Sequence, residues 1–290
     1  MTQPLSGTGI WSSALRYGDP AEIAAAAIEL ESLGYSALWI PDVGGDVFGA
    51  VRNLLGATST ATVATGILNL WMHTAAETAE QHAALTAEHG SRFLVGIGVS
   101  HAPLIDRTIE AGAYQRPLAQ TRDFLDALDA APIPLAASDR ALAALGPKML
   151  ALAAARTAGV HPYLVTPEHT NVARQAVGPD ALVATEQGVV LDSDPQRARS
   201  TARANLVRYF ALPNYTNNWK RLGFTDDDIA DGGSDRLIDA LVVWGDVATI
   251  AERIQEHRDA GASHVCIQVL TEEPRSLPLE QWRALAPVLV

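Results

Sequence analysis

The chain has 290 residues, of which 48% are hydrophobic and 19% are charged, and its formal net charge is −12. This composition is typical of a globular protein with a sizeable core, and the length suits one large barrel or two modest domains. Binding to nucleic acid requires a basic face, so the acidic balance argues against nucleic acid as a general partner. The single cysteine, Cys266, excludes an internal disulfide framework and any cysteine-based metal cluster.

The same features predict a cytoplasmic protein without a membrane partner. No apolar run approaches the roughly 20 residues that a membrane-spanning helix needs. The N-terminal segment MTQPLSGTG lacks the basic and apolar regions of a signal peptide.

The first half of the chain alternates strand and helix patterns. Asp19 and Pro20 are typical of a helix cap and a first helical position. Thr74 and Glu77 have the spacing of a capping box, and Gly90 is the usual residue after a helix end. We expect strands at 8–12, 35–40, 61–70 and 93–99, helices at 20–34, 47–60, 74–89 and 117–130, and a polar loop at 102–116.

The second half continues the alternation. The fifth strand could lie at Pro134–Ala137 or at Arg140–Leu145, and the second is preferred because Gly146-Pro147-Lys148 would then form a tight strand-to-helix turn. We expect further strands at 161–165, 181–185 and 264–270. We expect helices at 147–159, 192–211, 245–261 and 278–288, and another helix that begins at residue 167. An irregular insertion is expected at 213–233.

Eight strands that alternate with helices predict an α/β fold, a single (β/α)8 TIM barrel over residues 1–290 with an insertion after strand seven. A doubly wound sheet is the alternative, but no G-x-G-x-x-G follows the first strand.

In a TIM barrel the active site lies where the strands end. His101 follows the Gly-x-Gly end of strand four, where a flat ligand could lie against backbone, and a histidine there could move protons. A loop histidine with a backbone partner is the alternative. Asp42 could accept a hydrogen bond from a ligand or simply form the turn before Gly44. Trp71 and Tyr163 are candidates for substrate contact, with packing as the alternative.

The turn at Gly146-Pro147-Lys148 combines free N–H groups, a helix dipole and an ammonium group, which suits a phosphate. A helix cap with a solvated lysine is the other interpretation.

Two further polar residues, His73 and Glu186, lie near strand ends. His73 precedes the Thr74 cap and is expected to be exposed, whereas Glu186 could be a buried, hydrogen-bonded partner. A metal-dependent hydrolase is a further alternative, although its candidate ligands lack the spacing of known metal motifs. Those candidates are Asp42, His73, His101, His161 and Glu186.

Several segments carry a family resemblance. Three segments resemble the luciferase-like monooxygenase superfamily: GYSALWIPD, ATGILNLWMHTAAETAEQHAAL and SRFLVGIGVSH. Two further segments resemble the actinobacterial branch of this superfamily, which depends on coenzyme F420: AALGPKMLALAAARTAGVHPYLVTPEH and LVATEQGVVL. The resemblance implies a (β/α)8 barrel that holds F420, or alternatively FMN, at the carboxyl ends of the strands. Relatives are often dimers, which raises a homodimer as one option.

The resemblance also implies roles for individual residues. Asp42 falls where the family contacts the cofactor, Gly66-Ile67 falls where many members have a non-proline cis peptide behind the flavin ring, and Asn69 matches a polar position near the ring or ribityl chain. The residues that match the phosphate-binding turn are Gly146, Pro147, Lys148 and Met149.

One position departs from the sugar-phosphate dehydrogenases of the family, because Val43 stands where they carry a catalytic histidine. His101 is then the remaining acid–base candidate. The expected function is hydride transfer between F420 and a small organic substrate. The alternatives are an FMN-dependent monooxygenase that uses dioxygen, the metal-dependent hydrolase, and a non-catalytic relative that binds cofactor or a partner.

Overall fold

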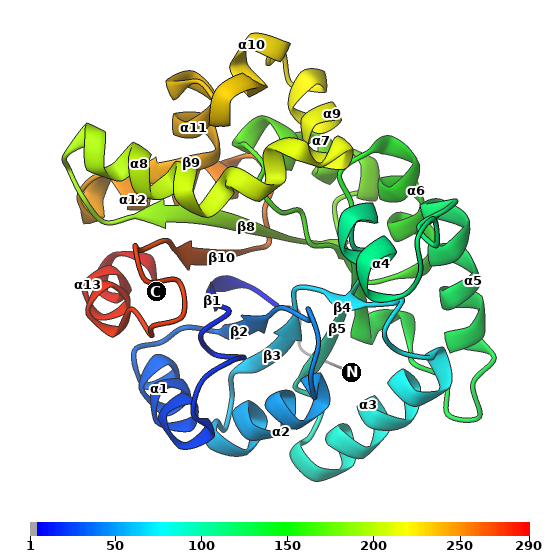
Figure 1. Cartoon of the computed structure of the whole chain (residues 1–290). Helices are drawn as coiled ribbons and strands as arrows, with labels where there is room; N and C mark the ends of the chain where they lie inside the picture. The colour runs from blue at the N-terminus through cyan, green and yellow to red at the C-terminus, as the bar shows by residue number, and fades with distance from the viewer. Residues whose placement is uncertain (1–4) are drawn as a thin grey trace.

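The computed structural model describes residues 5–290, and its centre is a closed barrel of parallel strands (Figure 1). Residues 1–4 of the N-terminal segment considered above lie outside the described residues. The pairing of β10 with both β1 and β8 closes the barrel. Its eight strands are β1 (Gly7–Trp11), β2 (Ala37–Ile40), β3 (Thr62–Thr65), β5 (Phe93–Gly98), β6 (Arg140–Leu142), β7 (Gly159–Val160), β8 (Leu182–Val190) and β10 (His264–Val269). The predicted TIM barrel is confirmed.

Two short strands extend the sheet beyond the closed barrel. The strand predicted at 61–70 is broken at the Gly66–Ile67 peptide bond, which is cis, and continues as β4 (Leu68–Asn69), paired with β5. The N–H of Asp42 still donates to the Ile67 carbonyl at 3.2 Å, so the chain stays joined to the end of β2 across the break. The other strand, β9 (Val242–Trp244), pairs with the last residues of β8.

Helices surround the barrel, and side chains cap several of them as the sequence predicts. Asp19 accepts from the N–H groups of Ala21 and Glu22, and the Thr74 hydroxyl accepts from the Glu77 N–H at 3.1 Å. The helices of the outer layer are α1 (Pro20–Ser32), α2 (Val47–Ala57), α3 (Ala75–His89), α5 (Pro117–Asp129), α6 (Pro147–Arg156), α7 (Pro167–Val177), α8 (Pro195–Leu206), α12 (Val247–Asp259) and α13 (Leu279–Leu289). No helix in residues 5–290 is long and apolar enough to cross a membrane.

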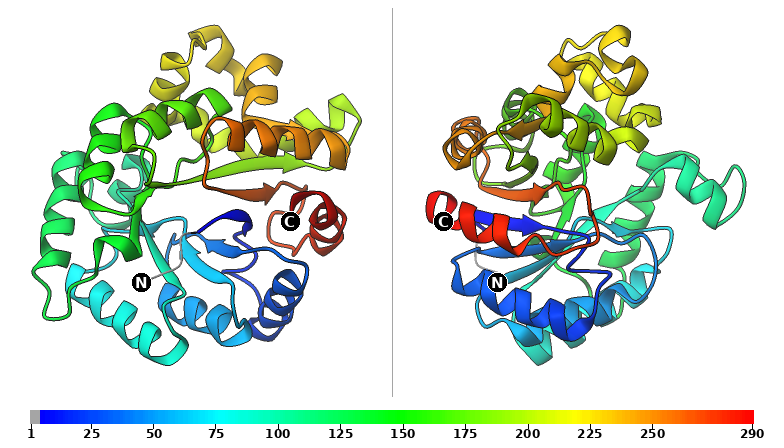
Figure 2. Two further views of the ribbon diagram at one scale, coloured as in Figure 1. Left: turned by 180° about the vertical axis from the view of Figure 1, so that it is seen from behind. Right: turned by 60° about the vertical axis from the view of Figure 1, so that its left-hand side comes forward.

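The insertion after β8, the seventh barrel strand, is helical, so the prediction of an irregular segment at 213–233 was wrong. It contains α9 (Pro213–Arg221), α10 (Asp226–Ile229), a 3-10 turn (Ala230–Gly232) and α11 (Asp235–Leu241). Figure 2 shows these yellow-to-orange helices standing together at one end of the molecule. They have an apolar core of their own, centred on Trp219, Phe224 and Leu237. The apolar residues of this short segment are buried against one another and against β8, an arrangement that the local pattern did not reveal.

Three other predictions need correction. The loop expected at 102–116 contains α4 (Ala102–Thr108), which buries Ile105 completely. The sixth strand is β7 at 159–160 rather than 161–165, and the helix predicted at 192–211 ends in a 3-10 turn (Val207–Ala211). In each case contacts made by the tertiary structure decided where the element ends.

The interior of the barrel requires glycine where strands come close together. A Cβ atom on Gly96 would lie 2.0 Å from the carbonyl oxygen of Thr65, and one on Gly98 would lie 2.6 Å from Cγ1 of Ile67. Glycine at these two positions lets the Thr65 carbonyl and the Ile67 side chain lie against the backbone of β5.

A Gly96→Ala substitution is therefore expected to destabilise the fold by about 1–3 kcal/mol, because backbone must shift to admit the methyl group. Urea unfolding measures the effect. Gly56→Ala is the matched control: the nearest atom to its added Cβ is 3.7 Å away, and alanine is favoured over glycine in a helix by about 1 kcal/mol. Equal stability of the Gly96 variant and wild type would contradict the close packing described.

Candidate active site

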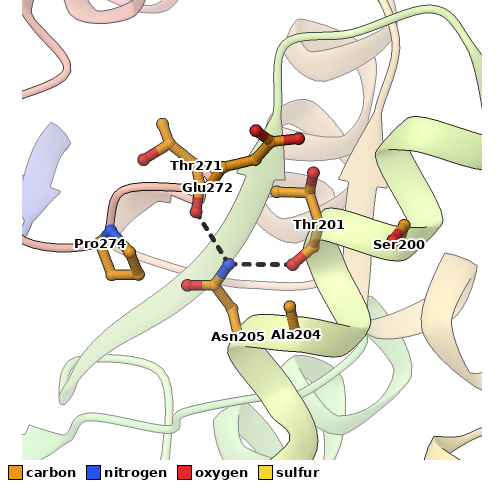
Figure 3. A pocket seen from close by; sticks show the side chains of 7 residues that line it. All are labelled: Ser200, Thr201, Ala204, Asn205, Thr271, Glu272 and Pro274. Carbon is orange, nitrogen blue, oxygen red and sulfur yellow. Dashed lines mark hydrogen bonds between the residues drawn. The ribbon is translucent and has the colours of Figure 1, made fainter.

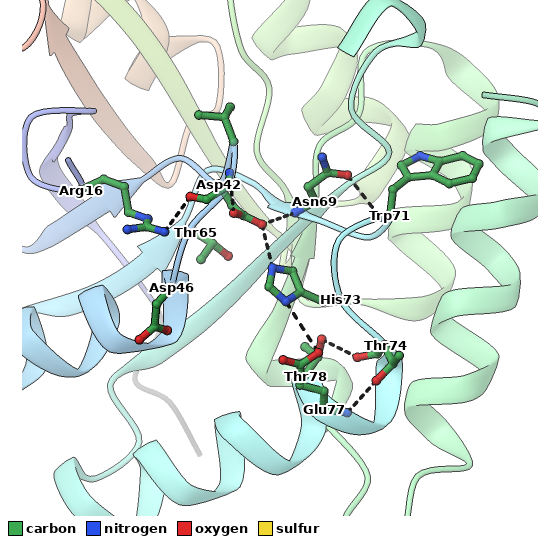
Figure 4. Close-up of polar contacts among 12 residues, drawn as sticks. Arg16, Asp42, Asp46, Thr65, Asn69, Trp71, His73, Thr74, Glu77 and Thr78 are labelled. Carbon is green, nitrogen blue, oxygen red and sulfur yellow. Dashed lines mark hydrogen bonds and ion pairs between the residues drawn. The ribbon is translucent and has the colours of Figure 1, made fainter. Parts of the chain in front are cut away.

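The Asp42 carboxylate lies at the end of β2 and binds three segments together (Figure 4). Its Oδ2 accepts from the Asn69 backbone N–H at 3.1 Å and from Nε2 of His73 at 2.9 Å, and its Oδ1 accepts from the Gly44 N–H at 3.3 Å. Only 1% of the Asp42 side chain is exposed. The carboxylate is thus committed to protein donors and acts mainly by positioning its neighbours.

His73 is not the exposed residue that the sequence suggested, since 11% of its side chain is exposed. Burial by itself lowers the pKa of His73, but the hydrogen bond and charge of Asp42, with a further contribution from Glu77, outweigh burial and raise the pKa. The protonated imidazole is therefore stabilised beside Asp42. The spacing of Asp42 and His73 in sequence gave no sign of this pair, because two different strand-to-helix loops supply its members.

Asn69 carries hydrogen-bonding capacity that the protein leaves unused. The residue is fully buried, its Oδ1 accepts from the Trp71 N–H at 3.2 Å, and its Nδ2 has no partner. Figure 4 shows the Asn69 and Trp71 side chains directed away from His73. Because buried amide groups are nearly always paired, a free Nδ2 at the barrel mouth is what a ligand-binding amide would show before its ligand is added.

The Gly66–Ile67 bulge lies directly before Asn69 and has the cis peptide bond that the resemblance implied. The Gly66 carbonyl accepts from Nε1 of Trp11 at 3.0 Å. A Cβ on Gly66 would lie 2.5 Å from that nitrogen and 2.8 Å from Nε2 of His161, so only glycine fits. The bulge is thus held from one side by two aromatic rings.

His161 is a supporting residue of this bulge. It is buried, its Nδ1 lies 2.8 Å from the Ala184 carbonyl, and its ring stacks on Trp39 at 4.2 Å. Burial lowers the pKa of His161 to about 4, so the ring is neutral at physiological pH.

His101 lies after β5, as predicted, and its side chain faces the insertion; the helix α4 that follows it was not predicted. Its ring centroid is 5.4 Å from that of Tyr215, and its Nδ1 has no partner. Burial lowers the pKa of His101 to about 4; a hydrogen bond with Asn214 opposes the shift and the charge of Arg208 adds to it. A neutral imidazole with a free nitrogen can accept a proton at pH 7.

Tyr163 belongs to a directed chain of hydrogen bonds that sequence reasoning missed. Nη2 of Arg208 donates to the Tyr209 hydroxyl at 2.9 Å, and the Tyr163 hydroxyl donates to Oε1 of Gln268 at 2.8 Å. The two hydroxyls are 3.2 Å apart, so Tyr209 donates to Tyr163 and completes the chain. The Tyr and Asn residues at 209–218 were visible in the sequence, but their position over the barrel depends on the insertion.

Glu186 is buried and hydrogen-bonded, as the sequence suggested. Its Oε2 accepts from the Leu164 N–H at 3.1 Å, while its Oε1 has no partner. Burial raises the pKa of Glu186 to about 8, and the Leu164 hydrogen bond opposes the shift only in part. The carboxyl group is therefore mostly protonated at neutral pH.

The predicted turn at residues 146–149 begins α6, with Gly146 as cap and Pro147 in the first turn. No side chain caps this helix, and the N–H groups of Met149 and Leu150 both donate to the Gly146 carbonyl at 3.0 Å. Pro147 and Lys148 are exposed. The start of α6 therefore presents its helix dipole and an ammonium group without a side-chain acceptor.

The five candidate metal ligands do not converge. Asp42 and His73 pair with each other, whereas His161 supports the bulge and Glu186 bonds to Leu164. Within residues 5–290, no group of three or more His, Cys, Asp or Glu side chains is placed to hold a metal ion.

A surface pocket between α8 and the loop after β10 includes none of the predicted site residues (Figure 3). Its Asn205 Nδ2 donates to the carbonyls of Thr201 and Thr271, so the most polar side chain of the helix wall is already engaged. The lining residues are Ser200, Thr201, Ala204, Asn205, Thr271, Glu272 and Pro274.

The family model described as luciferase-like monooxygenase matches residues 5–132, and no curated protein matches the chain. Three solved structures share the fold. An F420-dependent secondary alcohol dehydrogenase with an F420-acetone adduct has a TM-score of 0.74 at 15% identity, covering 99% of this chain and 98% of its own. The F420-dependent tetrahydromethanopterin reductase of Methanopyrus kandleri has a TM-score of 0.75 at 18% identity, covering 99% of both chains.

The third structure is the oxygenating constituent of 3,6-diketocamphane monooxygenase from the CAM plasmid of Pseudomonas putida, in complex with FMN. Its TM-score is 0.66 at 15% identity, covering 98% of this chain and 97% of that one. The family model supports the resemblance to the luciferase-like superfamily over residues 5–132, and the structures compared show that the fold is shared with enzymes of both cofactor types.

The buried Glu186 predicts a dependence of stability on pH. Its pKa is about 8 in the folded chain against 4.5 for an ordinary glutamate, so the folded state holds the proton more tightly and the free energy of unfolding falls as pH rises between these values. Glu186→Gln keeps an acceptor for the Leu164 N–H and should reduce the loss between pH 5.5 and 8.5 by about 3 kcal/mol. Urea unfolding of both proteins at the two pH values measures the difference; an unchanged slope would show that Glu186 is ionised in the fold.

Proposed function

We propose that this luciferase-like barrel is an oxidoreductase that uses coenzyme F420 to exchange a hydride with a small organic substrate. The observation that carries the proposal is the unpaired, buried amide of Asn69 directly beyond the cis Gly66–Ile67 bulge. When bound, the deazaflavin would supply or accept the hydride, and the protein would fix its orientation.

The residues present fit such a cofactor. Gly98 lets the Ile67 side chain lie directly against the backbone of β5, which fixes the position of Ile67 at the barrel mouth. Ile67 would pack behind the ring, and the Asn69 amide would donate to an oxygen of the ring or the ribityl chain. Asp42 would act through Asn69, whose backbone N–H it holds at 3.1 Å.

The phosphate of the cofactor would lie at the start of α6. Backbone N–H groups and the helix dipole stabilise an anion at such a position, and Lys148 adds a positive charge. The proposed residues of this subsite are Gly146, Pro147, Lys148 and Met149.

His101 would handle the proton that accompanies hydride transfer. Its free Nδ1 and its neutral state at pH 7 suit it to accept a proton from a substrate hydroxyl, or to return one in the reverse direction. Trp71 and Tyr163 would contact the substrate. Trp71 is fixed by donation from its Nε1 to the Val99 carbonyl at 2.9 Å, and Tyr163 by its bond to Gln268.

An FMN-dependent monooxygenase is the second candidate, supported by the fold shared with the FMN-bound 3,6-diketocamphane monooxygenase. A ring in front of Ile67 and a phosphate at the start of α6 would suit either cofactor.

Fluorescence titration of the purified protein with F420 and with FMN tests the cofactor. We expect F420 to bind at micromolar protein and to bind more tightly than FMN, and Asn69→Leu to weaken F420 at least about tenfold, because its amide donors are lost. Preference for FMN together with oxygen uptake would favour the monooxygenase. Binding of neither cofactor would refute both candidates.

His101→Ala should lower turnover about 10²–10⁴-fold while leaving F420 binding unchanged, because only proton transfer is lost. Because the pKa of His101 is about 4, wild-type turnover should fall only below about pH 5 on the acid side. Absorbance of F420 with a panel of secondary alcohols and ketones provides the assay. His89→Ala, on the outer helix α3, controls for loss of an imidazole. Unchanged turnover of the His101 variant would show that another group moves the proton.

A further inference from the structure

The insertion helix α9 is fixed in place beside the start of α6. Trp219 is fully buried, and its Nε1 donates to the Leu164 carbonyl at 3.1 Å, in the loop that leads from β7 to α7. Tyr215, one turn earlier, is also buried, and its ring centroid lies 6.1 Å from that of Trp219. With these two anchors on one face, the last turn of α9 has a defined position over the barrel.

Arg221, in that last turn, reaches the α6 start. Its Nη2 lies 3.7 Å from the position that a Cβ of Gly146 would occupy, and it donates to Oδ1 of Asn218 at 3.1 Å. No carboxylate in residues 5–290 lies within 4.0 Å of this guanidinium. The neighbouring Lys220, in contrast, forms an ion pair with Asp226.

Asn218 provides a second, independent observation beside Arg221. The residue is 1% exposed, and its Nδ2 has no partner, although its Oδ1 is held by Arg221. An amide with two unused N–H donors beside an uncompensated guanidinium requires an acceptor, preferably an anionic one.

A backbone carbonyl next to the start of α6 already has a side-chain partner. The Leu145 carbonyl, one residue before Gly146, is 3.0 Å from Nε2 of His169. Burial lowers the pKa of His169, the Leu145 bond opposes this, and the charge of Arg221 lowers it further, so the ring is a neutral donor to that carbonyl. Within residues 5–290, the hydrogen-bond acceptor of Arg221 is Oδ1 of Asn218, and no group at the start of α6 accepts from it.

We propose that Arg221 and Asn218 complete the phosphate subsite at the start of α6, so that the insertion binds the phosphate group of the cofactor from the side opposite the helix. This inference rests on the proposed function for the identity of the ligand. It assigns to the insertion a part in cofactor binding in addition to any contact with substrate. A planar guanidinium suits the phosphate, because it can donate two parallel hydrogen bonds.

The test compares ligands with and without phosphate. The dissociation constants of FMN and riboflavin are measured by fluorescence for wild type, Arg221→Gln and Lys220→Gln. We expect the preference for FMN over riboflavin to fall about tenfold in Arg221→Gln and to be unchanged in Lys220→Gln. The preference for FMN should also depend less on salt concentration in Arg221→Gln than in wild type. Arg221→Lys should recover part of the preference, and thermal melting confirms that each variant is folded.

Two outcomes separate this inference from the proposed function. If flavins bind but the preference for FMN is the same in Arg221→Gln and wild type, the inference is wrong and the function stands. If no flavin binds, whether or not F420 does, thermal stabilisation by inorganic phosphate is compared between the same proteins. Stabilisation that is lost only in Arg221→Gln supports the anion site without the cofactor, and equal or absent stabilisation overturns it.

Discussion

The Asp42 carboxylate is the interaction on which the candidate site depends. It is bound to the backbone of Asn69, to the backbone of Gly44 and to the His73 ring, so it joins the end of β2 to the segment beyond the bulge and to the start of α3. A buried carboxylate is stable only when donors surround it, and here the donors are the segments that must be positioned. The unpaired amide of Asn69 owes its fixed place to this carboxylate.

Leu164 performs a comparable role on the other side of the barrel. Its N–H donates to Glu186 on β8, its carbonyl accepts from Trp219 of α9, and its φ of 53° turns the chain between them. One residue thus connects a buried carboxyl group inside the barrel with the helix that carries Arg221. The orientation of the insertion and the protonation state of Glu186 therefore both depend on the hydrogen bonds of Leu164.

Much of the fold could be predicted because its signals are local. Apolar runs predicted the strands, and caps such as Asp19 and Thr74 predicted where helices begin, since a capping side chain binds backbone only two or three residues away. The insertion helices were missed because their apolar residues are few and gain their burial from one another. The Asp42–His73 pair and the chain from Arg208 to Gln268 were missed because residues from separate loops form them.

The sequence by itself determined the eight-stranded barrel, the helix start at Gly146, and, through family resemblance, the position of the cis bond at Gly66–Ile67. Only the tertiary structure decided which polar groups are satisfied and which remain free. Asp42 and Asn69 are both buried polar residues near strand ends, yet both carboxylate oxygens of Asp42 have partners and Asn69 keeps an unpaired amide nitrogen. Hydrogen-bond satisfaction and the pKa of a buried group depend on every neighbour in three dimensions, and no local pattern contains that information.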